Sequence, residues 1–362
     1  MPNTDLQQAS RPKRALALLS GGLDSLLAVR IIQEQGIEVE GVNFYTGFCV
    51  EGHTQALRKT DKTKRHSALY SAQQLGIKLH IVDISEAYKE VVLRPKYGYG
   101  KHANPCTDCK IFMLKQAKLM LEKAHEMVKT EGFDFIITGE VIGQRPNSQL
   151  KKKMPIIAEE SQTEDILLRP LCAKKLEPTL PERLGWVDRE KLYSYYGRNR
   201  SPQIELAQHF GFEDYAQPAG GCCFLTDDSY TKKLQDLWQS RGQRDYEMDD
   251  IILLKVGRHI RPAAHFKLII SREEGETHYL EGYRDRFLSM KAANTGGALM
   301  LIDGSPTEDD LKLAAQICAR YSKAKFDPQV AVDLKRPRDP LIQRFQVQPF
   351  GIDDMPAEWI LQ

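Results

Sequence analysis

Hydrophobic and polar positions follow two alternating patterns along the first 140 residues. Short apolar runs alternate with longer segments whose apolar residues recur every three or four positions. The runs predict buried strands and the longer segments predict amphipathic helices. The predicted strands cover 15–19, 39–44, 79–82 and 133–138, and the predicted helices cover 23–34, 54–75 and 110–129, the last with Thr107 as N-cap. Strands that alternate with helices predict a parallel α/β sheet with helices on both faces.

The pattern changes in the second half of the chain. The alternation of strands and helices becomes less regular after residue 150. A strand is predicted over 166–171 and a helix over 201–210. Strands over 251–255, 266–271 and 298–302 and a helix over 308–323 then predict a small α+β domain. The predicted organisation is a disordered leader over 1–13, an α/β domain over 14–225, the α+β domain over 226–325 and a tail over 326–362.

Composition excludes several classes of protein. The chain has 362 residues, and 51 Lys and Arg against 49 Asp and Glu give a net charge of +2, so any nucleic-acid contact must be local. The sequence contains no apolar run of membrane-spanning length and no signal peptide, which predicts a cytoplasmic protein with no membrane partner. Seven cysteines in a reducing compartment indicate metal binding or catalysis rather than a disulfide scaffold.

A glycine-rich loop follows the first predicted strand and opens the first helix. It reads Ser20-Gly21-Gly22-Leu23-Asp24-Ser25. Two glycines let the backbone approach a ligand closely, and the helix N-terminus offers free N–H groups to an anion. The Walker pattern is absent, because no Gly-Lys-Ser/Thr follows.

This loop resembles the PP-loop of ATP pyrophosphatases, which adenylate a substrate and release pyrophosphate. The resemblance implies the adenine nucleotide alpha hydrolase-like fold and ATP as cosubstrate. It also implies that Asp24 acts in catalysis near Mg²⁺. The residues implied to bind the ATP phosphates are Ser20, Gly21, Gly22, Asp24 and Ser25.

Two cysteine segments stand out. Cys106 and Cys109 form a C-x-x-C at the start of a predicted helix, where the helix N-terminus favours a thiolate, and Cys222-Cys223 follows two glycines. Four cysteines could hold structural zinc, although adjacent cysteines suit one ion badly. Three could instead hold a [4Fe–4S] cluster with an open iron, or form a persulfide relay. The three-cysteine set Cys106, Cys109 and Cys223 favours the cluster, with Cys222 as the alternative third ligand. The remaining cysteines are expected to pack in the core: Cys49, Cys172 and Cys318.

The resemblance narrows at these segments. Residues 104–110, Asn-Pro-Cys-Thr-Asp-Cys-Lys, and residues 221–225, Gly-Cys-Cys-Phe-Leu, are similar to the cysteine segments of tRNA 2-thiouridylases. Residues 138–149, which include Gly139 and Gln144, and Leu-Arg-Pro-Leu at 168–171 are similar to segments of tRNA 4-thiouridine synthetases. Both families adenylate a uridine carbonyl oxygen and replace it with sulfur. The resemblance covers about 14–225 and implies nucleotide contacts for Gly139 and Gln144.

The chain departs from both families. No RNA-binding THUMP domain precedes the loop, one extra residue separates Gln144 from Ser148, and the C-terminal domain does not read as the 2-thiouridylase β-barrel. Another segment is therefore expected to hold RNA. Residues 255–272 contain five cations and no acid, and Gly257-Arg258-His259 resembles NFACT-like RNA-binding domains. The five cations are Lys255, Arg258, Arg261, Lys267 and Arg272. A second candidate mixes tyrosines and arginines over 193–200.

The sequence thus predicts an ATP-dependent tRNA sulfurtransferase that forms 4-thiouridine or 2-thiouridine. Its partners would be tRNA and a sulfur donor, either a persulfide carrier or sulfide. Two alternatives stay open: a PP-loop ligase or amidotransferase acting on a small molecule, and an RNA-binding, zinc-stabilised protein with a vestigial loop. A homodimer is also left open.

Overall fold

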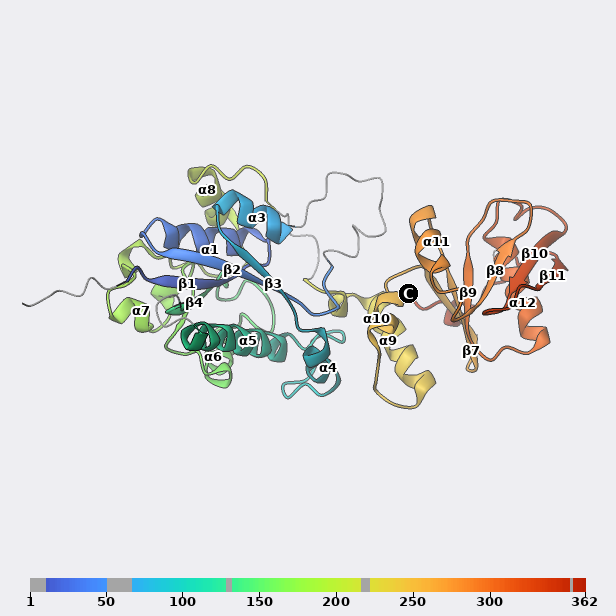
Figure 1. Ribbon diagram of the computed structural model, residues 1–362, viewed down its shortest axis with the longest axis horizontal. Helices are drawn as coiled ribbons and strands as arrows, with labels where there is room; N and C mark the ends of the chain where they lie inside the picture. Colours follow the sequence, from blue (N-terminus) through green and yellow to red (C-terminus); the bar gives the residue numbers. More distant parts are fainter. Residues whose placement is uncertain (1–10, 51–66, 128–131, 216–221, 352–353) are drawn as a thin grey trace, which may run out of the picture. The chain divides into compact units, whose positions relative to one another are not determined.

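The computed structural model describes residues 11–50, 67–127, 132–215, 222–351 and 354–362 (Figure 1). The chain divides into two compact units. The first unit consists of Met1–Thr46 and Thr63–Gly220, and the second consists of Gly47–Lys62 and Gly221–Gln362. Residues 47–50 therefore belong with the C-terminal half of the chain, although the residues before them belong to the first unit.

A parallel sheet forms the centre of the first unit. Its described strands are ordered β3-β2-β1-β4-β5. Their bounds are β1 Arg14–Leu18, β2 Glu38–Tyr45, β3 Leu79–Asp83, β4 Phe135–Thr138 and β5 Leu167–Leu168. Leu18, the last residue of β1, pairs with Val42 on one side and with Thr138 on the other. Because all these strands run in one direction, their carboxyl ends share one edge, where ligands bind in such folds.

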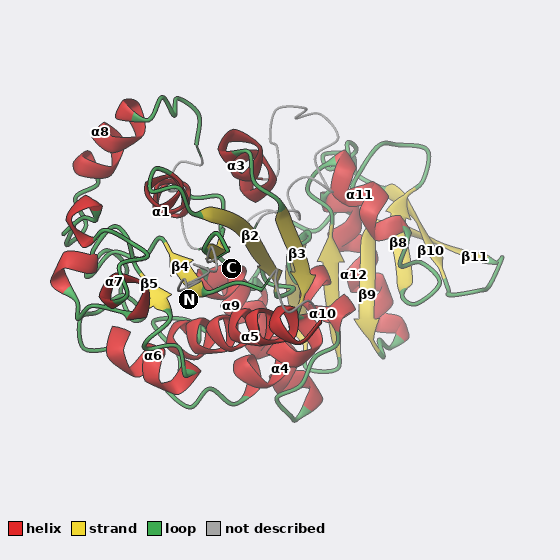
Figure 2. Cartoon of the chain, turned by 60° about the vertical axis from the view of Figure 1, so that its left-hand side comes forward, coloured by secondary structure: helices red, strands yellow, loops and turns green. Residues whose placement is uncertain are grey.

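Helices cover both faces of this sheet, as Figure 2 shows for α1 and α3 on one face and α5 on the other. Leu23, Leu26 and Leu27 of α1 are fully buried in one apolar cluster, and Leu114 of α5 is fully buried in another. The predicted α/β architecture is confirmed. The helices are α1 Leu23–Gln33, α3 Ser67–Leu75, α4 Ser85–Leu93, α5 Cys106–Met127, α6 Met154–Ser161, α7 Leu180–Arg183 and α8 Ser201–His209. No described helix combines the length and apolarity needed to cross a membrane.

Three predicted elements of this unit are shorter or placed differently. Of the helix predicted over 54–75, residues 54–66 lie outside the described part, and the rest includes α3. Helix α5 begins at Cys106, so Thr107 lies inside its first turn and is not its N-cap. The strand predicted over 166–171 ends at Leu168, because Arg169 turns to a buried carboxylate and Pro170 has no N–H to donate.

The second unit contains an antiparallel sheet. In the described residues its order is β11-β10-β8-β9-β7-β6. Helix α12 packs on this sheet through Leu311, Ala314 and Ala315, and Leu253 and Leu280 belong to a separate apolar cluster. The strands are β6 Arg258–Ala263, β7 Phe266–Ile270, β8 Leu288–Ala292, β9 Met300–Gly304, β10 Val330–Lys335 and β11 Ile342–Val347; the helices are α9 Asp228–Arg241, α10 Met248–Leu253, α11 Glu274–Glu281 and α12 Glu308–Arg320.

Two sequence predictions differ from the structure here. The strand predicted over 251–255 is wrong: Ile251 lies in helix α10, which Glu247 and Asp250 start with a capping box. A short apolar run does not distinguish a strand from a buried helical turn. The segment predicted as a tail contains strands β10 and β11, and Val332 and Leu334 are fully buried in the core of the second unit. Prolines that lie outside the two strands obscured the alternation of apolar and polar residues along them in the sequence.

Candidate functional site

The loop Ser20–Ser25 joins β1 to α1 at the carboxyl edge of the parallel sheet. Gly21 has φ +79°, and a Cβ added there would lie 2.0 Å from the Ser67 hydroxyl oxygen and 2.5 Å from the Ala68 nitrogen. Only glycine fits this position. The Ser25 hydroxyl donates to the Gly22 carbonyl at 2.8 Å and lies 3.3 Å from the Ser20 hydroxyl. The loop thus presents hydroxyls and helix N-terminal N–H groups together, a set that suits a phosphate.

Asp24 lies in the first turn of α1, and its carboxylate is hydrogen-bonded to the first of two linked glutamines. Gln144 Nε2 donates to Asp24 Oδ2, and Gln203 Nε2 donates to Gln144 Oε1 at 2.9 Å. Asp24 Oδ1 is buried and has no hydrogen-bond partner among the described residues. Burial raises the pKa of Asp24, and the positive charge of Arg200 opposes that rise. A buried carboxylate with one unsatisfied oxygen is suited to a hard cation.

Gly139 allows the segment after β4 to approach this loop. A Cβ added at Gly139 would lie 2.3 Å from the Asp24 carbonyl carbon and 2.4 Å from the Ser25 nitrogen. Both Gly139 and Gln144, selected from their sequence segment, therefore adjoin Asp24. The sequence reasoning missed Gln203, whose only signal was its position at the start of a predicted helix; it is fully buried.

Cys106 and Cys109 lie in the first turn of α5. Asn104 Nδ2 donates to Cys106 Sγ at 3.1 Å, and Asp108 Oδ1 accepts from the Lys96 backbone nitrogen at 2.8 Å. An amide donor and a helix N-terminus both favour a thiolate at Cys106. Asp108, which lies between the two cysteines, thus holds the loop that precedes the helix in place.

A buried ion cluster connects this helix to the ends of two strands. Glu140, two residues after β4, is 2% exposed, and its carboxylate lies 3.6 Å from Lys110 Nζ and 3.0 Å from Arg169 Nε. Burial raises the pKa of Glu140, but the charges of Lys110 and Arg169 outweigh burial and lower it overall. Since Lys110 follows Cys109 directly, this cluster holds the cysteine turn near the sheet edge that carries Asp24.

A pocket of about 350 Å³ lies beside the same segment. It is lined by Ile142, Lys151, Lys175 and Tyr196. Tyr196 is 63% exposed, and Lys175 Nζ lies 6.0 Å from the centre of its ring. The Gly197 nitrogen donates to the Ile142 carbonyl at 2.7 Å, which fixes Tyr196 next to the strand end that leads to Gln144. An exposed ring with two lysines can stack a base and contact phosphates.

The second cysteine segment pairs with a residue that the sequence reasoning treated as packing. Cys223 forms an antiparallel bridge with Cys49, and both side chains are partly exposed, whereas Cys222 is exposed. Lys255 Nζ donates to the Gly47 carbonyl in the same unit. Burial lowers the pKa of Lys255 to about 8, and the charges of Cys49 and Cys223 oppose that shift. The three side chains therefore form one cluster.

The three-cysteine metal site expected from the sequence stays a prediction. Within the described part of the chain, no three Cys, His, Asp or Glu side chains gather closely enough to hold a metal ion. Cys106 and Cys109 belong to the first unit and Cys223 belongs to the second.

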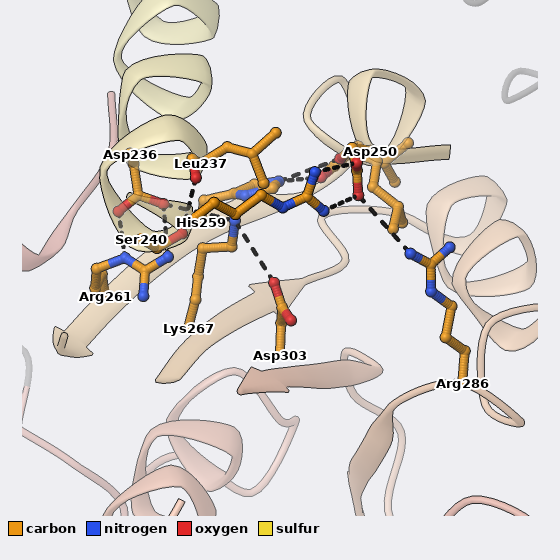
Figure 3. Close-up of polar contacts among 12 residues, drawn as sticks. Asp236, Leu237, Ser240, Asp250, His259, Arg261, Lys267, Arg286 and Asp303 are labelled. Carbon is orange, nitrogen blue, oxygen red and sulfur yellow. Dashed lines mark hydrogen bonds and ion pairs between the residues drawn. The ribbon is translucent and has the colours of Figure 1, made fainter. Parts of the chain in front are cut away.

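The basic stretch 255–272 is largely neutralised. Figure 3 shows Arg261 and Lys267 around Asp236, with Asp303 next to Lys267. Lys255 and Lys267 are 6% and 2% exposed, and Arg272 forms an ion pair with Glu276. The sequence selected these cations for contact with RNA; Lys255 and Lys267 are too buried for that role, and Arg261 and Arg272 are ion-paired. Asp236 and Asp303 are far from the stretch in sequence, so the absence of acids within it gave no warning.

His259 lies at the centre of the same interior. It is fully buried, and its Nε2 lies 3.0 Å from the Val256 carbonyl and 3.2 Å from the Leu253 carbonyl. Burial, with the charges of Lys233 and Lys267, lowers the pKa of His259 well below its usual value. This histidine is a neutral core residue.

A different group of cations remains exposed in the second unit. Arg258 lies over the Tyr321 ring at 5.4 Å, and Lys325 lies 5.1 Å from the ring of Phe326, which is 82% exposed. None of the cations in this group forms an ion pair among the described residues. We name this surface the 320–326 face; it comprises Arg258, Arg320, Tyr321, Lys323, Lys325 and Phe326. One acid, Asp327, follows it.

Parts of both units match known protein families. Residues 13–180 match the family described as tRNA methyl transferase HUP domain, and residues 257–360 match the NFACT protein RNA binding domain. A tRNA-specific 2-thiouridylase MnmA from Sulfurimonas denitrificans is 35% identical over 285 residues, covering 76% of this chain and 68% of the relative.

A more distant relative is the tRNA-specific 2-thiouridylase MnmA 1 of Syntrophus aciditrophicus, 27% identical over 231 residues, or 62% of this chain. The chain matches 56% of the length of that protein. Among solved structures, the C-terminal part of the fibronectin/fibrinogen-binding protein from Streptococcus suis covers 69% of this chain and 87% of its own at 11% identity, with a TM-score of 0.25. That score is too low to support an argument. The sequence relatives and the PP-loop geometry together place the chain in the PP-loop ATP pyrophosphatase family of tRNA thiouridine synthetases.

Proposed function

We propose that this protein is an ATP-dependent tRNA sulfurtransferase that adenylates a uridine carbonyl oxygen and replaces the oxygen with sulfur. One observation carries the proposal. The PP-loop, the buried Asp24 and the C-x-x-C turn of α5 converge on the carboxyl edge of one parallel sheet, and Glu140 connects that turn to the strand ends. A phosphate loop and a pair of thiols are the two requirements of the reaction.

The loop would hold the phosphates of ATP through its N–H groups and the hydroxyls of Ser20 and Ser25. Asp24, with its unsatisfied buried oxygen, would hold Mg²⁺ beside them. When bound, this ion neutralises phosphate charge. The uridine oxygen attacks the α-phosphorus, pyrophosphate leaves, and the loop donors stabilise the charge that develops on the phosphate oxygens. Gln144 keeps Asp24 oriented, and Gln203 fixes Gln144.

The acceptor nucleotide would enter through the pocket beside Ile142. Its base would stack on Tyr196, and its phosphates would contact Lys151 and Lys175. Because the pocket adjoins the segment that carries Gln144, a base held there lies close to the phosphate loop. This location makes a nucleotide a better acceptor than an amino acid or a carboxylate.

Sulfur would pass through cysteine thiols. Cys106, Cys109 and Cys223 are the proposed sulfur-handling residues, and the donor is a persulfide. The [4Fe–4S] cluster expected from the same three cysteines stays a prediction, and no step here is routed through it. Iron analysis of protein purified without oxygen tests this choice, because about four irons per chain would restore the cluster.

The tRNA body would bind the second unit. The match to an RNA-binding domain supports this assignment, and the 320–326 face supplies exposed cations and a ring. Cations on such a face contact phosphates, and Phe326 can stack on an unpaired base. The candidate surface shares only Arg258 with the basic stretch selected from the sequence.

The decisive test incubates the whole chain with ATP, Mg²⁺, a low-molecular-weight persulfide and unmodified tRNA. We expect pyrophosphate release that depends on tRNA, and a thiouridine in the digested tRNA by mass spectrometry. The retention time distinguishes 2-thiouridine from 4-thiouridine. Absence of tRNA-dependent pyrophosphate release, with tRNA binding intact, would contradict the enzyme and favour an RNA-binding protein, which the match over residues 257–360 supports as the second candidate.

A further inference from the structure

The phosphate loop carries no positive side chain of its own. Residues 20–25 contain neither lysine nor arginine. A Walker loop, by contrast, uses a lysine to reach the β- and γ-phosphates of its nucleotide. When ATP loses pyrophosphate, negative charge builds up on the leaving group, and fixed positive charge near that group stabilises the transition state. In this protein such charge has to come from a segment outside the loop.

Helix α8 brings its N-terminal end next to Asp24. Gln203, in the first turn of α8, donates to Gln144, and Gln144 in turn donates to Asp24 in the first turn of α1. The two helices lie against each other (Figure 1), and Leu206 of α8 is buried in the same apolar cluster as Leu26 of α1. The N-terminal ends of both helices carry positive partial charge, and both therefore lie beside the same carboxylate.

Arg200 directly precedes α8, and its guanidinium has no acidic partner at ion-pair distance. Within the described part of the chain it forms no ion pair, and its Nε is buried without a hydrogen-bond partner. Its charge nevertheless reaches Asp24, because it is the largest effect that opposes the rise in the pKa of Asp24 caused by burial. A buried guanidinium N–H without an acceptor is unfavourable, so an anionic ligand beside Asp24 would complete this arginine.

Arg145 supplies a second positive charge from another segment. It directly follows Gln144, and its backbone nitrogen donates to Gln149 Oε1 at 3.1 Å, which fixes the turn that carries it. Its charge also opposes the rise in the pKa of Asp24, and it forms no ion pair among the described residues. Its side chain is exposed, whereas that of Arg200 is partly buried. Two arginines without an ion pair thus act on one buried carboxylate, from two segments outside the loop.

We propose that Arg200, assisted by Arg145, binds the pyrophosphate group of ATP and neutralises it as it leaves. The proposal rests on the ATP-dependent function above. The sequence reasoning considered Arg200 only within a possible RNA contact over 193–200, and the comparisons assign neither arginine a role. The partly buried Arg200 is expected to contribute more than the exposed Arg145, because solvent screens an exposed charge.

The step that the arginines assist is the displacement at the α-phosphorus. The acceptor oxygen forms a bond to the α-phosphorus, the bond from that phosphorus to the bridging oxygen breaks, and its electron pair stays with pyrophosphate. Arg200 and Arg145 donate hydrogen bonds to oxygens of the leaving group and exchange no proton with it. The planar guanidinium suits this contact, because it presents parallel N–H donors to two phosphate oxygens.

The first experiment needs no tRNA. Isothermal titration of the whole chain with inorganic pyrophosphate in Mg²⁺ buffer compares the wild type with Arg200→Met, which removes the charge and keeps an unbranched side chain. We expect the affinity for pyrophosphate to fall roughly tenfold or more, and Arg200→Lys to recover part of the loss, because lysine restores the charge without the planar fork. The control Arg198→Met changes an exposed arginine of the same segment and should bind pyrophosphate as the wild type does.

Titration with AMP separates a lost ligand contact from damage to the fold. AMP lacks the β- and γ-phosphates, so Arg200→Met should bind AMP as tightly as the wild type does. Wild-type affinity of Arg200→Met for pyrophosphate would overturn the proposal. An equal loss of affinity for pyrophosphate and AMP would also overturn it, since Arg200 would then support the site as a whole.

The second experiment measures tRNA-dependent pyrophosphate release over a range of ATP concentrations. In Arg200→Met, kcat/KM for ATP should fall roughly tenfold or more, while the affinity for tRNA in a binding titration stays at the wild-type value. Weaker tRNA binding with unchanged pyrophosphate binding would assign Arg200 to RNA and overturn the proposal. If the wild type itself shows no tRNA-dependent release, the proposed function fails, and the pyrophosphate titration still decides the role of Arg200.

Discussion

The two units of this protein differ in how well the sequence predicted the surroundings of their polar side chains. In the first unit, residues from short sequence segments meet at the carboxyl edge of the sheet: Asp24, Gly139 and Gln144 are neighbours there. In the second unit, the acid-free basic stretch 255–272 is largely neutralised by acids from other segments, as where Lys267 lies against Asp236. Motifs that combine glycine with specific polar residues selected residues that are neighbours in the structure, whereas charge counted along the chain did not predict which cations are exposed.

The difference has a physical cause. A glycine-rich turn between a strand and a helix has a geometry that local backbone constraints determine, so the sequence alone predicts that geometry. Whether a lysine is exposed depends on which acids reach it from distant segments. Asp236 lies on α9 and Asp303 on β9, and neither position is readable from residues 255–272.

The largest effect is expected at Asp24. Asp24→Asn should lower tRNA-dependent pyrophosphate release by roughly 10²–10³-fold, since it removes a charge aimed at the phosphate site while keeping the shape. Steady-state pyrophosphate assays measure the loss. The exposed Glu213→Gln, in the same unit, serves as control and should retain activity. Equal activity in Asp24→Asn and the control would remove Asp24 from the site.

The next largest effect concerns the ion cluster of the first unit. Glu140→Gln should lower the free energy of unfolding by about 3–5 kcal/mol, because Lys110 and Arg169 would remain in the interior without their counter-charge. Urea titration followed by fluorescence measures the change. Glu122→Gln, which removes a surface partner of Lys118, should cost less than about 0.5 kcal/mol. A loss at Glu140 no larger than at Glu122 would contradict the buried cluster.

A smaller effect is expected on the 320–326 face. The double variant Lys323→Glu/Lys325→Glu should weaken tRNA binding roughly tenfold to hundredfold and reduce the salt slope by about two. Fluorescence titrations across a salt series measure both quantities. The control Lys335→Glu/Arg338→Glu makes the same charge change elsewhere in the unit and should keep the slope. If the control pair lowers the slope as much, binding responds to net charge and not to this face.

The smallest effect is a pH dependence of the second unit. The pKa of His259 is depressed in the folded state, so below about 6.5 the unfolded chain binds a proton that the native protein refuses. Stability is therefore complete above that pH and falls by up to about 1.4 kcal/mol per pH unit below it, down to the folded pKa. Urea titrations between pH 7 and 5.5 measure the slope. His259→Gln should flatten it and the exposed His278→Gln should not; an unchanged slope in His259→Gln would assign it to other groups.

The sequence by itself determined the α/β architecture of the first unit and the position of its glycine-rich loop between β1 and α1. Their signals are local: apolar periodicity, a strand before Ser20 and a helix after Gly22. It also identified Gly139 and Gln144 through their segment, although not their contacts with Asp24. The second unit was harder to predict, since an apolar run that reads as a strand became α10 under a capping box, and two strands followed where a tail was expected.

Only the tertiary structure decided which charges cancel and which thiols meet. Cys49 and Cys223 are separated by most of the first unit in sequence, and no spacing rule connects them; an isolated backbone bridge does. The same holds for Lys110, Glu140 and Arg169, which belong to a helix and two strand ends. Contacts of this kind depend on long-range pairing, because burial and dielectric environment are properties of the folded chain.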